Sequence, residues 1–200
     1  MSNYRREVVQ KLSTHLIAHP HTTLQIAAER LGLSGEVIED ALREQEGVTF
    51  QEFLANQKLE QAFQQLGERH PAADGPYEIA RARRRVLFPR STVKYQVHRF
   101  WLFKSEHSHP CPLVDLSSEG LAFLTDEPPA PEERVALFIK FPGSETTLRV
   151  KGTVVYSLAT GIAGYRCRVG IKFLPFADRR GCNDLKTREI LLNIEKTHDA

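Results

Sequence analysis

The chain has 200 residues, 41% of them hydrophobic, and a formal net charge of +2 at pH 7. That length suits one or two domains, and the nearly balanced charge indicates no partner by itself. Three widely spaced cysteines, at positions 111, 167 and 182, exclude a disulfide framework and favour reduced thiols. The sequence shows neither a signal peptide nor an apolar run of about eighteen residues, so we expect a cytoplasmic protein without direct membrane insertion.

The first half of a helical module is predicted from apolar spacing and helix ends. Apolar residues recur at helical spacing over residues 4–18, and Pro20 ends this first helix. Thr22 or Thr23 can cap a second helix, which ends before Gly32. The sequence therefore predicts two helices joined by a short polar connection.

Two further helices follow. Ser34 can cap a third helix, which Gly47 closes. Thr49 and Glu52 have the spacing of a capping box, which predicts the start of a long fourth helix. We expect residues 1–67 to form one helical module, with a tight turn between the second and third helices that is typical of a helix-turn-helix.

Residues 22–67 resemble the first helix-turn-helix and the linking helix of AraC-type regulators. The resemblance is carried by residues 24–34 (LQIAAERLGLS) and 47–54 (GVTFQEFL). AraC-type domains contain two such units, whereas this chain has room for one before its linker. The third helix also contains five acidic residues and a single Arg43 over residues 34–46. Phosphate contacts by Lys and Arg dominate affinity for DNA, so an acidic third helix disfavours DNA binding, whereas the resemblance favours it. Both DNA binding and a protein-contact or dimerisation role therefore remain open.

A connector and a basic segment follow the helical module. Residues 68–80 are rich in Gly, Pro, Ala and polar groups and are interpreted as a linker. The sequence Arg81-Ala82-Arg83-Arg84-Arg85 comes next, and residues 81–104 contain eight basic residues and no acidic one. Guanidinium groups bind phosphates in a bidentate manner and stack on bases, so this segment is a candidate anion site.

Residues 81–200 are predicted to form a small β domain with a terminal helix. β-Forming residues and turns between them predict six short antiparallel strands, over residues 92–103, 109–117, 121–125, 134–141, 148–158 and 165–174. Six such strands suggest a closed barrel. Apolar spacing over residues 178–198 predicts an amphipathic helix. The fold class is therefore α+β: a helical module, a six-stranded antiparallel barrel and a C-terminal helix.

The segment Asp115-Leu116-Ser117-Ser118-Glu119-Gly120 is a candidate base-binding site. Residues two apart on a strand face the same side, so Asp115 and Ser117 would form an acceptor-rich patch. The Watson–Crick edge of guanine offers two adjacent donors to such a patch. Gly120 has no Cβ and can take a positive φ, which would allow a flat ring to approach the backbone.

Together the two segments resemble the PilZ family, in which an R-x-x-x-R segment precedes a β-barrel that carries [D/N]-x-S-x-x-G. Members of that family typically bind cyclic di-GMP. The resemblance implies that Arg81 and Arg85, with help from Arg84, hold phosphate and stack on guanine. It also implies that Asp115, Ser117 and Gly120 seat a guanine on the barrel.

No motif of an enzyme that makes or degrades cyclic di-GMP is present, so we expect a receptor that has no catalytic residues, metal or cofactor. We expect the ligand to reposition the helical module of a transcription regulator, with a homodimer supplying the second helix-turn-helix. The alternative is a protein–protein adaptor, in which the acidic module binds a protein. Arg166 and Arg168 share a strand face, and the sequence does not decide whether they flank the ligand.

Overall fold

The computed structural model describes residues 2–68, 90–97, 107–162 and 164–197. The chain folds as two compact units, Met1–Ala62 and Phe63–Ala200, each of which is described by itself. The predicted linker and Arg81, Arg84 and Arg85 lie outside the described residues, so the domain limits remain a prediction. Within the described part of the chain, no helix combines the length and apolar character needed to cross a membrane.

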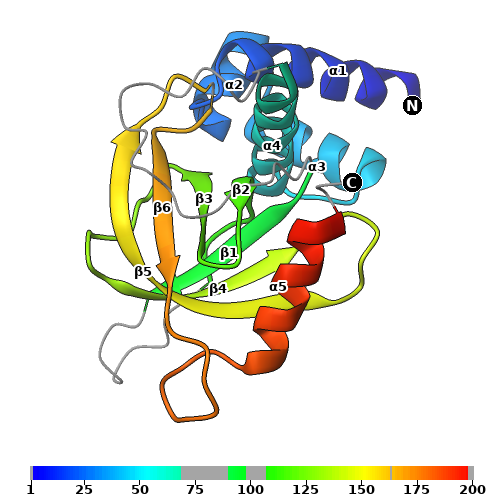
Figure 1. Ribbon diagram of the computed structural model, residues 1–200. Coiled ribbons are helices and arrows are strands. Elements are labelled where there is room, and N and C mark those ends of the chain that lie inside the picture. The colour runs from blue at the N-terminus through cyan, green and yellow to red at the C-terminus, as the bar shows by residue number, and fades with distance from the viewer. Residues whose placement is uncertain (1, 69–89, 98–106, 163, 198–200) are drawn as a thin grey trace. The chain divides into compact units, whose positions relative to one another are not determined.

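Four helices form the N-terminal unit, as predicted (Figure 1). They are α1 (Ser2–Ala18), α2 (Leu24–Leu31), α3 (Gly35–Gln45) and α4 (Phe50–Glu68). Their apolar faces meet in one core, in which Leu12, Ile38 and Leu42 are fully buried and Phe50 is 1% exposed. Burial of an amphipathic face, more than helix propensity, stabilises helices as short as α2 and α3.

The predicted helix ends are confirmed by the backbone geometry. The Thr23 side chain accepts a hydrogen bond from the Ile26 N–H, and the Ser34 side chain accepts one from the Val37 N–H. Gly32 ends α2 in the left-handed conformation, with φ of 65°. These contacts satisfy donors and carbonyls that the first and last turns of a helix leave open.

The capping box before α4 is also formed. The Thr49 N–H donates to Glu52 Oε2 over 2.9 Å, and the Glu52 N–H donates to Thr49 Oγ1 over 3.3 Å. The Thr49 N–H, together with the Thr49 hydroxyl, which also donates to Glu52 Oε2 over 2.9 Å, holds the pKa of the Glu52 carboxyl below its usual value. The start of α4 is therefore determined by four consecutive residues of sequence.

The second unit contains a closed antiparallel barrel, as predicted (Figure 1). Its strands are β1 (Thr92–Val97), β2 (Cys111–Leu116), β3 (Gly120–Thr125), β4 (Arg134–Lys140), β5 (Thr147–Ala159) and β6 (Cys167–Phe173). The order around the barrel is β1-β2-β3-β6-β5-β4, and every neighbouring pair is antiparallel. Alternate side chains point inward, and Phe123, Leu137 and Val169 are fully buried in the barrel core.

The C-terminal helix is shorter than predicted. It is α5 (Leu185–Thr197), and the expectation that it begins at residue 178 is wrong. Gly181 has a φ of 91°, and the Asn183 amide bonds the backbone N–H and C=O of Lys151 on β5. Because Asn183 is committed to β5, the helix can start only after it, and Asp184 Oδ1 then accepts from the Lys186 N–H. Leu191 and Ile194 of α5 pack against the barrel core.

Candidate nucleotide-binding site

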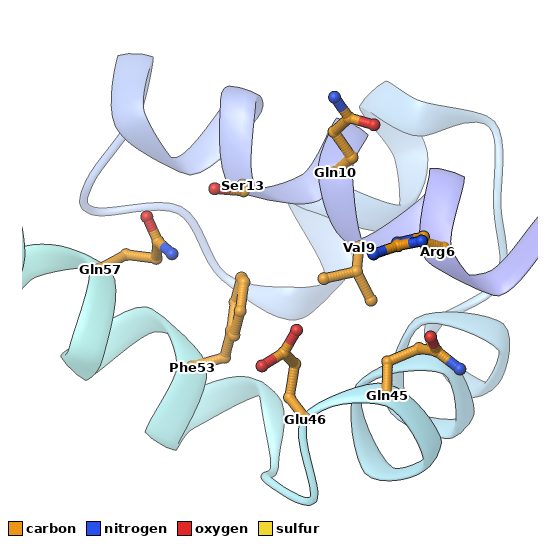
Figure 2. Close-up of a pocket in the computed structure, with 8 residues that line it drawn as sticks. All are labelled: Arg6, Val9, Gln10, Ser13, Gln45, Glu46, Phe53 and Gln57. Carbon is orange, nitrogen blue, oxygen red and sulfur yellow. The ribbon is translucent and has the colours of Figure 1, made fainter.

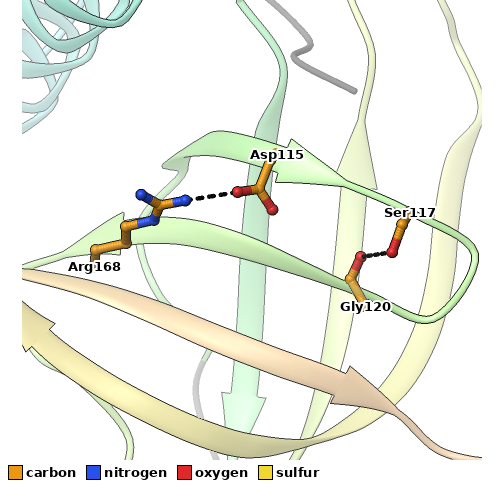
Figure 3. A network of polar contacts seen from close by, with 4 residues as sticks. All are labelled: Asp115, Ser117, Gly120 and Arg168. Carbon is orange, nitrogen blue, oxygen red and sulfur yellow. Dashed lines mark hydrogen bonds and ion pairs between the residues drawn. The ribbon is translucent and has the colours of Figure 1, made fainter. Parts of the chain in front are cut away.

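The predicted base-binding residues lie around the tight turn between β2 and β3, with Asp115 on β2, Ser117 in the turn and Gly120 at the start of β3. The Ser117 N–H donates to the Gly120 carbonyl oxygen over 2.8 Å, and Ser117 Oγ donates to the same oxygen over 3.2 Å. Ser117 Oγ also accepts from the Glu119 N–H over 3.3 Å. Figure 3 shows the Ser117 side chain turned toward Gly120. The hydroxyl therefore shapes the turn, in addition to any contact it makes with a ligand.

Asp115 forms an ion pair that the sequence did not reveal. Arg168 Nη2 on β6 donates to Asp115 Oδ2 over 2.7 Å (Figure 3). The side chains of Arg168 and Asp115 are 22% and 5% exposed, respectively. A charge-assisted hydrogen bond of this length is stronger than a neutral one, and partial burial reduces its screening by water. Arg168 thus belongs to the site and orients the carboxylate that was predicted to accept from guanine.

The strand register explains how Arg168 reaches Asp115. Asp115 is opposite Ala122 on β3, and Ala122 is opposite Gly170 on β6. Arg168 lies two residues before Gly170, so its side chain points to the same outer face. Neither Ala122 nor Gly170 has a side chain large enough to block the guanidinium as it crosses β3. Sequence spacing showed that Arg166 and Arg168 share a face, but not that β6 neighbours β3.

An aromatic ring lies at the other end of this row. Gly170 is opposite Tyr156 on β5, and a Cβ built on Gly170 would lie 2.2 Å from Tyr156 Cε1. The ring therefore covers Gly170 directly. The outer side of these strands thus groups a buried carboxylate, a partly exposed guanidinium and a phenol ring around two small residues, groups that can hydrogen-bond or stack with a planar base.

The structure corrects the reason for a glycine at position 120. The positive φ that the sequence allowed is not adopted, because the positive-φ glycines of the described residues are 32, 47, 143, 164 and 181. Instead, a Cβ on Gly120 would lie 2.2 Å from the Ile171 carbonyl oxygen of β6. The position requires glycine because two backbones approach closely there.

The C-terminal helix also contacts the turn. Glu195 Oε1 on α5 accepts a hydrogen bond from the Ser118 N–H over 2.6 Å. The carboxylate thereby satisfies a backbone donor in the middle of the motif. No local pattern pairs residues 77 positions apart, so this contact could not be predicted from the sequence.

The predicted phosphate-binding residues, Arg81, Arg84 and Arg85, lie outside the described residues. Of the six predicted ligand contacts, the structure thus describes Asp115, Ser117 and Gly120, which lie around the connection between β2 and β3. Their roles in ligand binding stay predictions.

A separate cavity of about 640 Å³ lies in the helical unit (Figure 2). Residues of α1, of α4 and of the end of α3 line it, with Val9 and Phe53 as its apolar part. Its two charged residues are Arg6 and Glu46, which have opposite signs. The cavity therefore has no net charge with which to attract an anionic nucleotide.

Three solved structures show partial likeness to the chain. The first is MotI/DgrA, the inhibitor of motility of Bacillus subtilis, with 14% identity and a TM-score of 0.42 over 60% of this chain and 52% of that one. The second is MrkH of K. pneumonia in its apo state, with 12% identity and a TM-score of 0.43 over 60% and 51%. The third is PlzA of Borreliella burgdorferi in complex with c-di-GMP, with 12% identity and a TM-score of 0.36 over 54% and 43%. The match thus spans about half the length of these proteins or less.

A comparison with curated protein sequences finds no match. The profile of the PilZ domain matches residues 78–187, which include both predicted motifs and the whole barrel. That match does not include the helical module, so its resemblance to AraC-type regulators stays a prediction. More than half of the sequence lies within the matched region, and the chain belongs to the PilZ domain family.

Proposed function

We propose that this protein is a cyclic di-GMP-binding effector. The observation that supports this most directly is the intact Asp115-x-Ser117-x-x-Gly120 turn on the barrel of a PilZ domain. In this proposal Asp115 accepts hydrogen bonds from the two donors on the guanine edge, and Arg168 holds the carboxylate in place. Ser117 and Gly120 keep the turn in the shape that admits the base.

The arginine segment would hold the two phosphates of the ligand. Eight basic residues and no acidic one occur over residues 81–104, so this part of the chain can neutralise an anionic ligand. We assign phosphate binding and guanine stacking to Arg81 and Arg85, with Arg84 in support. The protein binds and releases its ligand without chemical change, as a receptor and not as an enzyme.

The ligand signal would pass to the helical module. Transcription regulation through its helix-turn-helix is one candidate output, and a protein–protein adaptor is the other. The surface of α3 favours the adaptor role for this module, because Glu36, Asp40 and Glu44 are exposed on it beside Arg43. An acidic helix is repelled by the phosphates of a DNA groove and suits a basic protein surface.

Calorimetric titration with cyclic di-GMP tests the proposed ligand. Arg85→Ala should lower affinity by about 1–3 kcal/mol, the value of charge-assisted hydrogen bonds, and Asp115→Asn should lower it by a similar amount. Arg188→Ala is a matched control, because Arg188 is an exposed arginine on α5. The proposal fails if the unaltered protein does not bind the nucleotide at micromolar concentration. Equal affinities for Arg85→Ala and Arg188→Ala would remove the assigned role of the arginine segment.

The two outputs differ in whether the nucleotide alters DNA binding. Fluorescence anisotropy with promoter DNA, measured with and without cyclic di-GMP across a range of salt, distinguishes them. A ligand-dependent change in DNA affinity supports a transcription regulator. An unchanged affinity, together with ligand-dependent crosslinking of the helical module to a protein, supports the adaptor.

A further inference from the structure

Three neighbouring strands of the barrel, β1, β4 and β5, contain basic residues and no acidic residue. Their cations are Lys94 on β1, Arg134 and Lys140 on β4, and Arg149 and Lys151 on β5. We call these five residues the basic face. The net charge of the whole chain is only +2, so it does not reveal this local group of five cations.

The alternation of the strands directs these cations outward. Their sequence neighbours are fully buried in the barrel core, so the cations point to the outside; these neighbours are Val93, Val135, Ile139 and Val150. All five cations except Lys151, which is half-buried, are exposed. The register places Lys94 opposite Phe138, and Phe138 opposite Arg149, in one row across the three strands. Neighbouring strands lie about 4.8 Å apart and a strand rises about 3.3 Å per residue, so the backbones of Lys94 and Arg149 lie about 10 Å apart and those of Arg134 and Lys140 about 20 Å apart.

The rows that contain the five cations have charge and polar donors, and the exposed apolar side chains of β5, Val155 and Leu158, lie farther along the strand, beyond Thr153. The Arg149 guanidinium lies 5.5 Å from the centroid of the Phe138 ring, and the His107 ring meets the same ring edge-on at 4.7 Å. Phe138 is thus flanked by a cation and an imidazole. Hydroxyl and amide groups occupy the outward positions next to these cations on β1 and on β5 as far as residue 153, at Thr92, Gln96, Thr147 and Thr153.

The chemistry of this face fits a phosphodiester backbone. Lysine is depleted in protein–protein interfaces, whose energy comes mainly from aromatic and apolar anchors. Phosphate oxygens, by contrast, accept from Lys, Arg, Thr and Gln side chains in protein–DNA complexes. Single-stranded nucleic acid is bound largely by stacking on exposed rings, whereas Phe138 is already flanked. These features favour duplex DNA held by its backbone.

Barrel topology separates this face from the β2–β3 turn. In the ring β1-β2-β3-β6-β5-β4, strand β4 is three places from β3 in either direction. Strand β4, the centre of the basic face, therefore lies across the barrel from β3, and β5 contributes Arg149 and Lys151 to the basic face and Tyr156 to the candidate nucleotide site. We propose that the basic face binds the backbone of duplex DNA without sequence specificity. The proposal goes beyond cyclic di-GMP binding and does not depend on it.

Fluorescence anisotropy of the full chain with a short labelled DNA duplex tests this proposal. Five phosphate contacts predict a slope of log K against log salt of about −4.5, so affinity should fall about 10²–10³-fold between about 50 and 200 mM salt. Lys94→Gln with Arg149→Gln should reduce the slope by about 2 and weaken binding roughly 10- to 100-fold at about 50 mM salt. Arg134→Gln with Lys140→Gln, on the same face, should give a similar loss.

The matched control is Arg30→Gln with Arg43→Gln, which removes two exposed arginines from α2 and α3. This variant should retain DNA affinity, and circular dichroism should show that all three variants are folded. Retained DNA binding in both barrel variants, or its loss in the α2–α3 variant, would overturn the proposal. So would stronger binding of the unaltered protein to polyglutamate or to phosphatidylserine vesicles than to DNA. Cyclic di-GMP titration of the same variants should show unchanged affinity for the nucleotide. The DNA-binding proposal and the cyclic di-GMP proposal can therefore fail independently of each other.

Discussion

Gly120→Ala should destabilise the barrel through a backbone clash. The added Cβ would lie 2.2 Å from the Ile171 carbonyl oxygen, 3.2 Å from the Ile171 carbonyl carbon and 3.4 Å from the α-carbon of Lys172. Ordinary van der Waals contact begins at 3.4 Å, so β3 and β6 must separate by about 1.2 Å (3.4 less 2.2) at this point. Overpacking of this kind costs about 1–3 kcal/mol, and a weakened ladder hydrogen bond adds about 1 kcal/mol. We expect the free energy of unfolding to fall by about 2–4 kcal/mol.

Urea unfolding followed by circular dichroism measures this change. Gly67→Ala is the matched control, because Gly67 lies in α4 and a Cβ there meets nothing within 4 Å. Alanine is the better helix former, so the control should be neutral or more stable by up to about 1 kcal/mol. Equal stabilities of the two variants would refute the close approach of β3 and β6. Cyclic di-GMP affinity should also fall in Gly120→Ala, because the Gly120 carbonyl accepts both bonds of Ser117.

Three further predictions concern other contacts. Arg168→Met should lower the free energy of unfolding by about 2 kcal/mol or more, because a buried carboxylate loses a charge-assisted bond; unchanged stability in urea would contradict this. Thr49→Ala should cost on the order of 1 kcal/mol in the same assay by removing a helix cap. The capping bonds lower the pKa of Glu52 in the folded state, so the stability that they contribute should be lost as pH falls through that lowered pKa. Urea unfolding at a series of acidic pH values should show this fall in the free energy of unfolding. Burial lowers the pKa of His15, and His19 and Arg30 lower it further. Protonation therefore favours the unfolded state, and stability should decrease as pH falls below the unfolded value of about 6.5, an effect that His15→Gln should remove.

Features that depend on a few neighbouring residues were predictable from the sequence. The caps at Thr23 and Ser34 and the Thr49–Glu52 box each join residues three positions apart, so their pattern contains the whole interaction. The strands were found by the same local reasoning, because alternation and turn residues determine where a strand begins and ends. The closed barrel followed from six such strands.

Features that depend on the register of distant strands were not predictable. Arg168 and Asp115 are 53 positions apart and meet only because β6 neighbours β3. Gly120 was expected to need a positive φ, whereas the approach of Ile171 from another strand is what excludes a side chain. The start of α5 was placed too early because Asn183 bonds β5, a contact that helical spacing does not encode.

Closure of the barrel has a consequence for how partners are recognised. Each of its six strands has a neighbour on both sides, and the shortest pairing, between β1 and β2, joins only Thr92 with Pro112 and Val93 with Cys111. Away from that short pairing, a binding partner cannot lengthen the sheet by adding a strand of its own, and must contact outward side chains or loops. Substitutions on the outer surface can therefore alter what one wall recognises while the hydrogen-bonded framework, and the opposite wall, remain as they are.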